Sequence, residues 1–152
     1  MTDHENAYIT ANVDALRAAV RHHLGDPTAL TDLDHALDRL SGTTNILAHM
    51  SGWAAAAKHV NPIPDDATPA LLAVDPATGQ QINIDDPRIP MEIRLGARMS
   101  AALLAEDHDT AVALWHTART PDAEEQVVLL VLRTMAALIA PNTTVEEART
   151  DD

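Results

Sequence analysis

The amino-acid sequence predicts an all-α protein, a bundle of four to six helices with a proline-rich central connection. Aromatic residues make up only 2% of the chain, whereas hydrophobic residues make up 46%. An apolar core without aromatic side chains favours helices, because sheet sandwiches rely on aromatic and β-branched residues. Apolar residues also recur at steps of three and four along much of the chain, which is the spacing of one helix face.

The first helix is expected to end at Gly25, because glycine adopts the left-handed conformation of a helix C-cap without strain. Asp26 and Pro27 then predict the N-cap and the first residue of a second helix. The first helix carries an apolar stripe that we expect to face the core: Ile9, Val13, Leu16, Val20 and Leu24.

The second helical region covers residues 27–59, and its leucine stripe is interrupted near Gly42. The sequence leaves open whether one helix or two occupy this range. We favour one continuous helix, because a glycine in a helix interior costs only about 1 kcal/mol.

Residues 61–90 contain six of the nine prolines, so a long helix cannot pass through them. Within this connection we expect one short β-hairpin at about 71–84. Pro76 and Gly79 suit the positions of a tight turn, and Ile82 and Ile84 alternate as they would in a strand. Two strands alone are barely stable, so the hairpin is expected to lie against the helices or against a partner's strand.

The third helical part begins at Pro90 and resumes after Asp107, which with His108 and Asp109 supplies a turn and an N-cap. Its last segment, 126–140, is apolar except near Arg133. A helix that is apolar on nearly every side must be surrounded by protein, so we expect it at the centre of a single domain spanning 1–142. Any face left uncovered predicts a dimer interface. The acidic tail, 143–152, is expected to be frayed.

The net charge of −13 and the isoelectric point near 4.7 argue against direct binding to nucleic acid or to an anionic membrane. The chain has no cysteine, which excludes disulfides, thiol catalysis and cysteine-bound zinc, and fits a reducing compartment. The N-terminus lacks the order of a signal peptide, and the apolar run is too short to span a bilayer. We therefore expect a cytoplasmic protein.

Two arginines, Arg94 and Arg98, lie four residues apart on the helix that follows Pro90. This positive strip suits either a small anion or pairing with carboxylates such as Glu92. On the second helix, Asp32 and His35 share a face opposite the leucine stripe, which predicts a solvated cluster.

The segment Asn45–Trp53, with the sequence NILAHMSGW, resembles the second-helix signature of DinB-type four-helix bundles. Some members of that family are metal-dependent thiol transferases, and the resemblance implies that His49 is a metal ligand. The family's other two histidines lie four residues apart on a later helix. The candidates in this chain, His108 and His116, lie eight residues apart, so the chain departs from the pattern there.

The sequence contains no catalytic motif at a known spacing, so the leading expectation is a non-enzymatic interaction or accessory module that needs no cofactor. The partner would be a protein or a second copy of the chain in a homodimer. Two alternatives remain: a metal-dependent bundle enzyme that uses His49 with His108 or His116, and an acidic DNA mimic that binds a DNA-binding protein. The interface candidates are Trp53, Trp115, Leu129 and Leu132.

Overall fold

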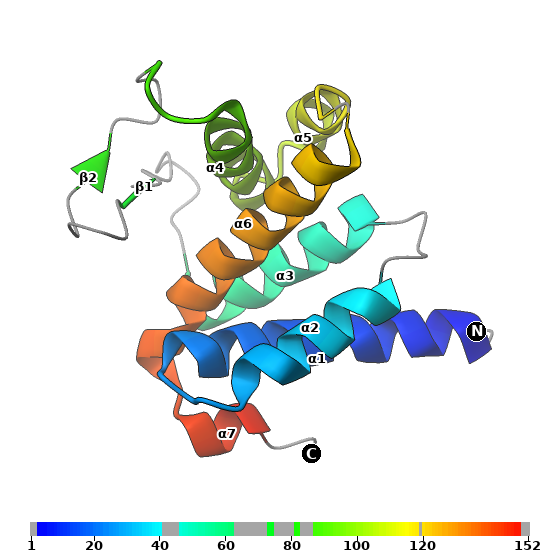
Figure 1. The fold of residues 1–152 in the computed structure, drawn as a ribbon, viewed down its shortest axis with the longest axis vertical. Helices are drawn as coiled ribbons and strands as arrows, with labels where there is room; N and C mark the ends of the chain where they lie inside the picture. The colour runs from blue at the N-terminus through cyan, green and yellow to red at the C-terminus, as the bar shows by residue number, and fades with distance from the viewer. Residues whose placement is uncertain are drawn as a thin grey trace. The chain divides into compact units, whose positions relative to one another are not determined.

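The computed structural model describes residues 3–40, 46–62, 73–74, 81–82, 87–118 and 120–149 (Figure 1). The all-helical class predicted from the composition is confirmed. The described residues form seven α-helices, one more than the upper limit expected, with a 3-10 turn and a pair of two-residue strands. In chain order the elements are α1 (Asp3–His23), α2 (Ala29–Leu40), α3 (Ile46–Val60), β1 (Ala73–Val74), β2 (Gln81–Ile82), α4 (Met91–Leu104), α5 (His108–Trp115), α6 (Pro121–Ile139), η1 (Ala140–Asn142) and α7 (Val145–Arg149).

The chain divides into two units. The first unit contains Met1–Pro62 and Leu132–Asp152, and the second contains Ile63–Val131. The helix α6 contributes residues to both units. A single domain over 1–142 stays a prediction.

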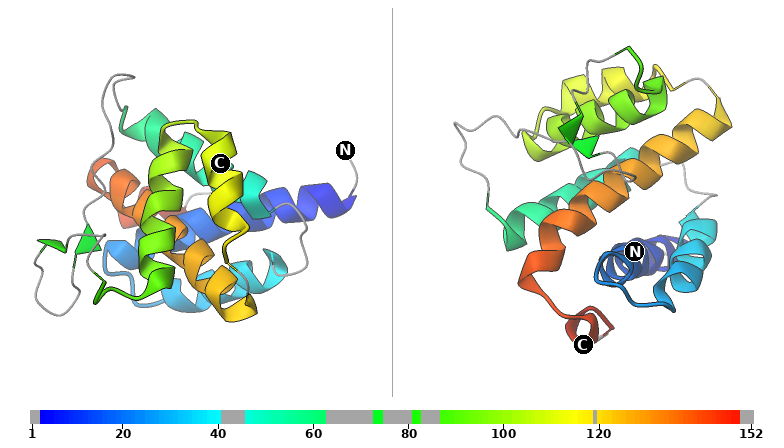
Figure 2. Two further views of the ribbon diagram at one scale, coloured as in Figure 1. Left: turned by 90° about the horizontal axis from the view of Figure 1, so that it is seen from above. Right: turned by 60° about the vertical axis from the view of Figure 1, so that its left-hand side comes forward.

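In the first unit, α1 and α2 form an antiparallel pair and lie side by side (Figures 1 and 2). The face of α1 that is buried differs from the predicted stripe, because Ile9 and Val13 are 48% and 39% exposed. The buried positions are mostly small: Ala11, Ala15, Ala18, Ala19 and Val20. Small side chains allow neighbouring helices to approach closely, so the alanine face of α1 is the one that packs.

The turn between α1 and α2 is organised by Gly25 and Asp26. Gly25 has a φ of +91°, which confirms its predicted left-handed conformation. The Asp26 carboxylate accepts hydrogen bonds from the backbone N–H and the hydroxyl of Thr28, at 3.0 and 2.9 Å. Asp26 therefore caps a turn that precedes the helix, and α2 begins at Ala29 rather than at Pro27.

Residues 27–59 contain two helices rather than the continuous helix expected, and α2 and α3 run in different directions (Figure 1). The reason lies in what α3 buries. Trp53 is fully buried, and its indole N–H donates a hydrogen bond to the carbonyl oxygen of Asn12 on α1 at 3.1 Å. A helix that continued straight on from α2 could not return to α1 in this way.

Within the segment 143–152, which was expected to be a frayed tail, Val145–Arg149 form α7. Thr144 caps this helix: its hydroxyl accepts from the Glu147 N–H at 3.2 Å and donates to the Glu147 carboxylate at 3.1 Å. Ala148 is buried, and α7 lies against α1 in the first unit. Residues 150–152 lie outside the described part of the chain.

The second unit contains α4 and α5, which pack against each other, and the first part of α6. As predicted, α4 follows Pro90, and the Asp107 side chain caps α5 by accepting a hydrogen bond from the Thr110 N–H. A methyl group added at Gly96 of α4 would lie 2.5 Å from Cδ2 of Leu130 on α6. The two helices are therefore in close contact at Gly96, where an added methyl group would require the Leu130 side chain to shift.

Along α6, one face is buried and the opposite face is partly exposed. The buried side chains are Val127, Val131, Leu132, Met135 and Ala136, and the 3-10 turn that follows adds Ala140. Arg133 is exposed, and most of the remaining apolar residues of the helix are partly buried. The apolar segment is thus covered on one side more completely than on the other.

The predicted hairpin falls mostly outside the described residues. Within it, β1 and β2 pair in antiparallel register, with Ala73 opposite Ile82 and Val74 opposite Gln81. Its turn, with Pro76 and Gly79, is not among the described residues, so the complete hairpin stays a prediction.

Candidate functional site

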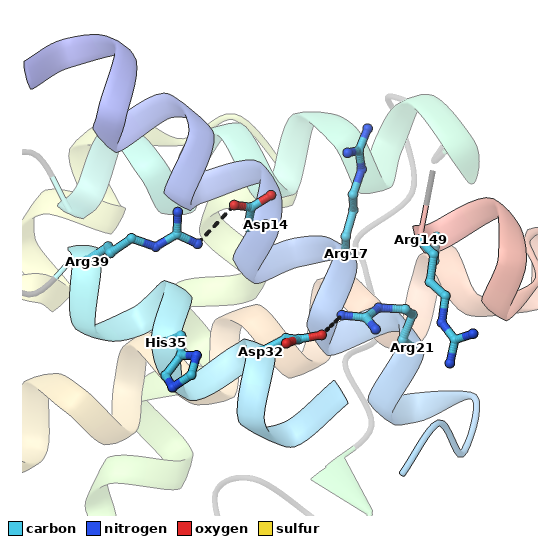
Figure 3. A pocket seen from close by; sticks show the side chains of 8 residues that line it. Asp14, Arg17, Arg21, Asp32, His35, Arg39 and Arg149 are labelled. Carbon is cyan, nitrogen blue, oxygen red and sulfur yellow. Dashed lines mark hydrogen bonds and ion pairs between the residues drawn. The ribbon is translucent and has the colours of Figure 1, made fainter. Parts of the chain in front are cut away.

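A cavity of about 400 Å³ lies in the first unit, among α1, α2 and α7 (Figure 3). All but one of the side chains that line it are ionisable: Asp14, Arg17, Arg21, Asp32, His35, Arg39 and Arg149, with Ala148 as the exception. We call this cavity the arginine pocket. Four of the ten lysines and arginines of the chain line it, although the chain as a whole carries a net charge of −13.

Helical spacing explains how the pocket is assembled. Arg17 and Arg21 lie four residues apart on α1, so they occupy the same face. On α2, His35 lies three residues after Asp32 and four before Arg39, which again places the three on one face. The antiparallel pairing of α1 and α2 brings these two ionisable faces to the same side, and α7 adds Arg149 (Figure 3).

Asp26 anchors the pocket from within the turn between the first two helices. Its side chain is 0% exposed and pairs with two arginines: its Oδ2 lies 3.2 Å from Arg21 Nη1 and 2.8 Å from Arg149 Nη2. The pKa of Asp26 is lowered to about 2, chiefly by the hydrogen bond from the Thr28 backbone N–H and also by Arg149, against the opposing effect of burial. The ionised Asp26 carboxylate therefore links Arg21 of α1 to Arg149, the last described residue.

Arg21 is the most enclosed of the four arginines, with a side chain that is 10% exposed. Besides Asp26, its guanidinium pairs with Asp32 through a short contact of 2.6 Å between Nη2 and Oδ2. Its Nε is buried and has no hydrogen-bond partner among the described residues. A buried donor without an acceptor is costly to the fold.

Arg39 and Asp14 form the rim of the pocket, and both are more exposed than Arg21, which forms its floor. Arg39 Nη2 and Asp14 Oδ2 lie 2.9 Å apart, and their side chains are 50% and 34% exposed. Ion pairs of this kind contribute about 0–1 kcal/mol, so they can exchange partners at little cost.

Arginine is the most frequent residue in the lining of the pocket. The pocket is lined by four arginines, by His35 and by the carboxylates of Asp14 and Asp32, and the buried Asp26 pairs with two of the arginines. Arginine is permanently charged and presents donors in a planar fork that matches carboxylate and phosphate oxygens. The arrangement is therefore suited to binding an anion.

His49, the candidate metal ligand, lies on α3 and is not among the residues that line the arginine pocket. Its Nδ1 lies 3.0 Å from the side-chain nitrogen of Asn12, and burial lowers the pKa of His49. His108 and His116 are exposed residues in and next to α5 in the second unit. Across the described ranges, no three His, Cys, Asp or Glu side chains form a group that could hold a metal ion. The metal alternative thus gains no support from the described geometry.

The predicted interface residues have different environments. Trp53 and Leu132 are fully buried, whereas Trp115 and Leu129 are partly exposed. Contact between a partner and the latter two stays a prediction. The core role of Trp53 follows from its burial and its hydrogen bond to Asn12.

Arg94 and Arg98, the predicted positive strip on α4, do not line the arginine pocket. Arg98 is exposed, whereas Arg94 is partly buried and its Nε has no hydrogen-bond partner in the described part of the chain. The arginine pocket was not predicted as a site. The available signal was the four-residue spacing of Arg17 and Arg21 beside the ionisable face of the second helix.

The chain matches no protein-family model, and comparisons with curated proteins and with solved structures gave no match. No helix of the described residues has both the length and the apolar character needed to cross a bilayer. The chemistry of the arginine pocket is therefore the basis on which a function can be proposed.

Proposed function

We propose that this protein is a non-enzymatic interaction module and that its arginine pocket holds an acidic group of a protein partner. One observation carries the proposal: four arginine residues line a single cavity of a chain whose net charge is −13. In a chain this acidic, such a concentration of positive charge favours a local role in binding.

The chemistry of the lining supports binding rather than proton transfer. A guanidinium keeps its charge at every physiological pH, so Arg17, Arg21, Arg39 and Arg149 are poor candidates for general acid or base catalysis. They are good donors to planar or tetrahedral anions, because each can give two parallel hydrogen bonds. A cavity near 400 Å³ also falls within the range of about 300–1,000 Å³ that is typical of ligand sites.

The acidic surface supports selectivity. A negatively charged chain repels long polyanions such as nucleic acids and anionic membranes, whereas a single acidic group can enter a locally positive cavity. The proposed partner is therefore a protein that presents an isolated acidic group. A cytoplasmic location, which the lack of cysteine favours, belongs to the same proposal.

The test is affinity capture from cells of the native source with three forms of the full chain. The pocket variant is Arg17→Gln with Arg39→Gln. The matched control is Arg88→Gln with Arg133→Gln, which removes the same charge from two exposed arginines outside the pocket. We expect the wild type and the control to retain the same partner and the pocket variant to lose it.

Retention of that partner by the pocket variant would contradict the proposal. If the retained protein binds DNA and is released by moderate salt from all three forms equally, the acidic DNA-mimic alternative replaces the proposal, because charge contacts spread over a surface are screened by salt.

A further inference from the structure

We infer that the acidic group for which the arginine pocket is built is a phosphate monoester rather than a carboxylate. The inference rests on the proposed binding role of the pocket and names the ligand class. Its basis is that the pocket already contains carboxylates bound to its arginines. A ligand must bind these arginines more tightly than the resident carboxylates do.

The resident carboxylates lie close to their arginines. Asp32 is 2.6 Å from Arg21, and Asp14 is 2.9 Å from Arg39. A carboxylate from another molecule would replace one of these with an identical chemical group. It would also have to compete against an acceptor whose effective concentration is high because it belongs to the same chain. The exchange of one carboxylate for another therefore gives little net gain.

A phosphate monoester differs from Asp14 and Asp32 in both charge and geometry. It carries roughly two negative charges at neutral pH and three acceptor oxygens, against one charge and two oxygens for a carboxylate. Hydrogen bonds between arginine and phosphate can be bidentate and charge-assisted. A dianion can thus displace a resident carboxylate and still gain interaction with the remaining guanidinium groups.

Exposure determines which carboxylates can be displaced. Asp32 and Asp14 are 54% and 34% exposed, so each can turn into water when its arginine is taken. Asp26 is fully enclosed and keeps Arg21 and Arg149 in position during the exchange. Arg21 lines the pocket with a side chain that is only 10% exposed, so its guanidinium stays in place when Asp32 turns away.

Two sources can provide this chemistry: a phosphorylated side chain of a protein partner, or a small phosphorylated molecule. The experiment uses the full chain and three probes at constant ionic strength and neutral pH: N-acetyl-O-phosphoserine amide, N-acetylglutamate amide and inorganic phosphate. Binding is followed by NMR chemical-shift changes of the protein. We expect the phosphoserine probe to bind at least about tenfold more tightly than the glutamate probe, because its additional charge adds charge-assisted hydrogen bonds.

The inorganic phosphate arm separates the sources. Tighter binding of the phosphoserine amide than of inorganic phosphate indicates a phosphorylated protein, since the pocket then recognises the peptide part as well. Equal binding indicates a small phosphorylated molecule. In both cases the phosphate class is supported.

Variants connect the binding to the pocket. Arg39→Gln changes an exposed residue and is expected to weaken the phosphoserine probe about tenfold, whereas Arg133→Gln, the exposed control, leaves its affinity unchanged. Asp32→Asn removes a resident carboxylate and is expected to raise the affinity for the glutamate probe, so that the preference for phosphate narrows. A role of Asp32 in folding alone would not change this preference.

Equal affinity for both probes in the wild type would overturn the phosphate inference and leave the proposed binding function standing, provided that Arg39→Gln weakens both. Phosphoserine binding that Arg39→Gln does not affect would overturn the inference, because the ligand would then lie elsewhere. Binding of none of the three probes would overturn it as well, while the capture experiment would still decide the proposed function separately.

Discussion

The two units of this protein bring helices together in opposite ways. In the first unit, α1, α2 and α7 meet around long charged side chains, which leave a cavity of about 400 Å³. In the second unit, α4 and α6 meet at Gly96, where even one added methyl group would overlap Leu130. The first arrangement leaves space between the helices, whereas the second removes it. The difference teaches that long charged side chains keep packed helices apart, whereas a glycine lets them approach closely.

The largest effect is expected from filling the contact at Gly96. Gly96→Ala would place a methyl group 2.5 Å from Cδ2 and 3.0 Å from Cβ of Leu130, and the latter cannot move without a shift of α6. Overpacking of this kind typically destabilises by 1–3 kcal/mol, so we expect a loss of about 2 kcal/mol in the free energy of unfolding, measured by chemical denaturation. The matched control is Gly52→Ala on α3, where the nearest heavy atom is 3.9 Å away. This control should stabilise the protein by up to about 1 kcal/mol, because alanine is the better helix former. An equal loss in both variants would refute the close contact.

The next effect concerns the anchor of the pocket. The folded pKa of Asp26 lies near 2, below its ordinary value of 3.8, so its ionised form stabilises the fold above about pH 4. That stability is lost as the pH falls from 3.8 towards 2. In Asp26→Asn the group does not titrate, so we expect lower stability than the wild type at pH 5 and a smaller further loss on acidification. Unfolding by urea at pH 5, 3.5 and 2.5 measures both curves, and parallel curves would contradict this role of Asp26.

A smaller effect is expected at His49, which lies outside the pocket in the same unit. Burial lowers the pKa of His49 below 6.5, so the folded state favours the neutral ring. Its contribution to stability is complete above pH 6.5 and decreases as the pH falls below that value. NMR titration of the His49 ring gives the pKa directly, and a value at or above 6.5 would contradict the prediction. His49→Gln, which cannot be protonated, should flatten the dependence of stability on pH between 7 and 5.

The smallest effect is expected at the rim of the pocket. A double-mutant cycle on Asp14→Asn and Arg39→Gln should give a coupling free energy of no more than about 1 kcal/mol, because the pair is exposed. The cycle is measured by urea unfolding at low and high salt. A coupling well above this value would mean that the pair of Asp14 and Arg39 stabilises the fold. The idea that this pair exchanges partners easily, whereas Arg21 and Asp26 stay paired, would then be wrong.

Local signals predicted the helical class and several helix boundaries. Gly25, Pro90 and Asp107 act on the residues next to them, so the sequence pattern alone indicates where the helices end or begin. The predicted core face of α1 was less accurate: the pattern placed Ile9 and Val13 inside, whereas the structure buries the alanine face. Large apolar residues at helical spacing do not reveal that a neighbouring helix packs more closely on smaller ones.

The arginine pocket could be predicted only in part. The shared faces of Arg17 with Arg21, and of Asp32 with His35, follow from helical spacing. The link between Asp26 and Arg149 joins positions 123 residues apart, and no local pattern indicates it. Long-range pairing depends on how α7 returns to α1, which is a property of the folded chain.

The glycine at position 96 also has an evolutionary consequence. A larger residue at 96 requires the side chain at 130 to shift or to become shorter, so substitutions at these two positions are expected to be coupled. Among diverged sequences that keep this fold, changes at the two sites should therefore be correlated.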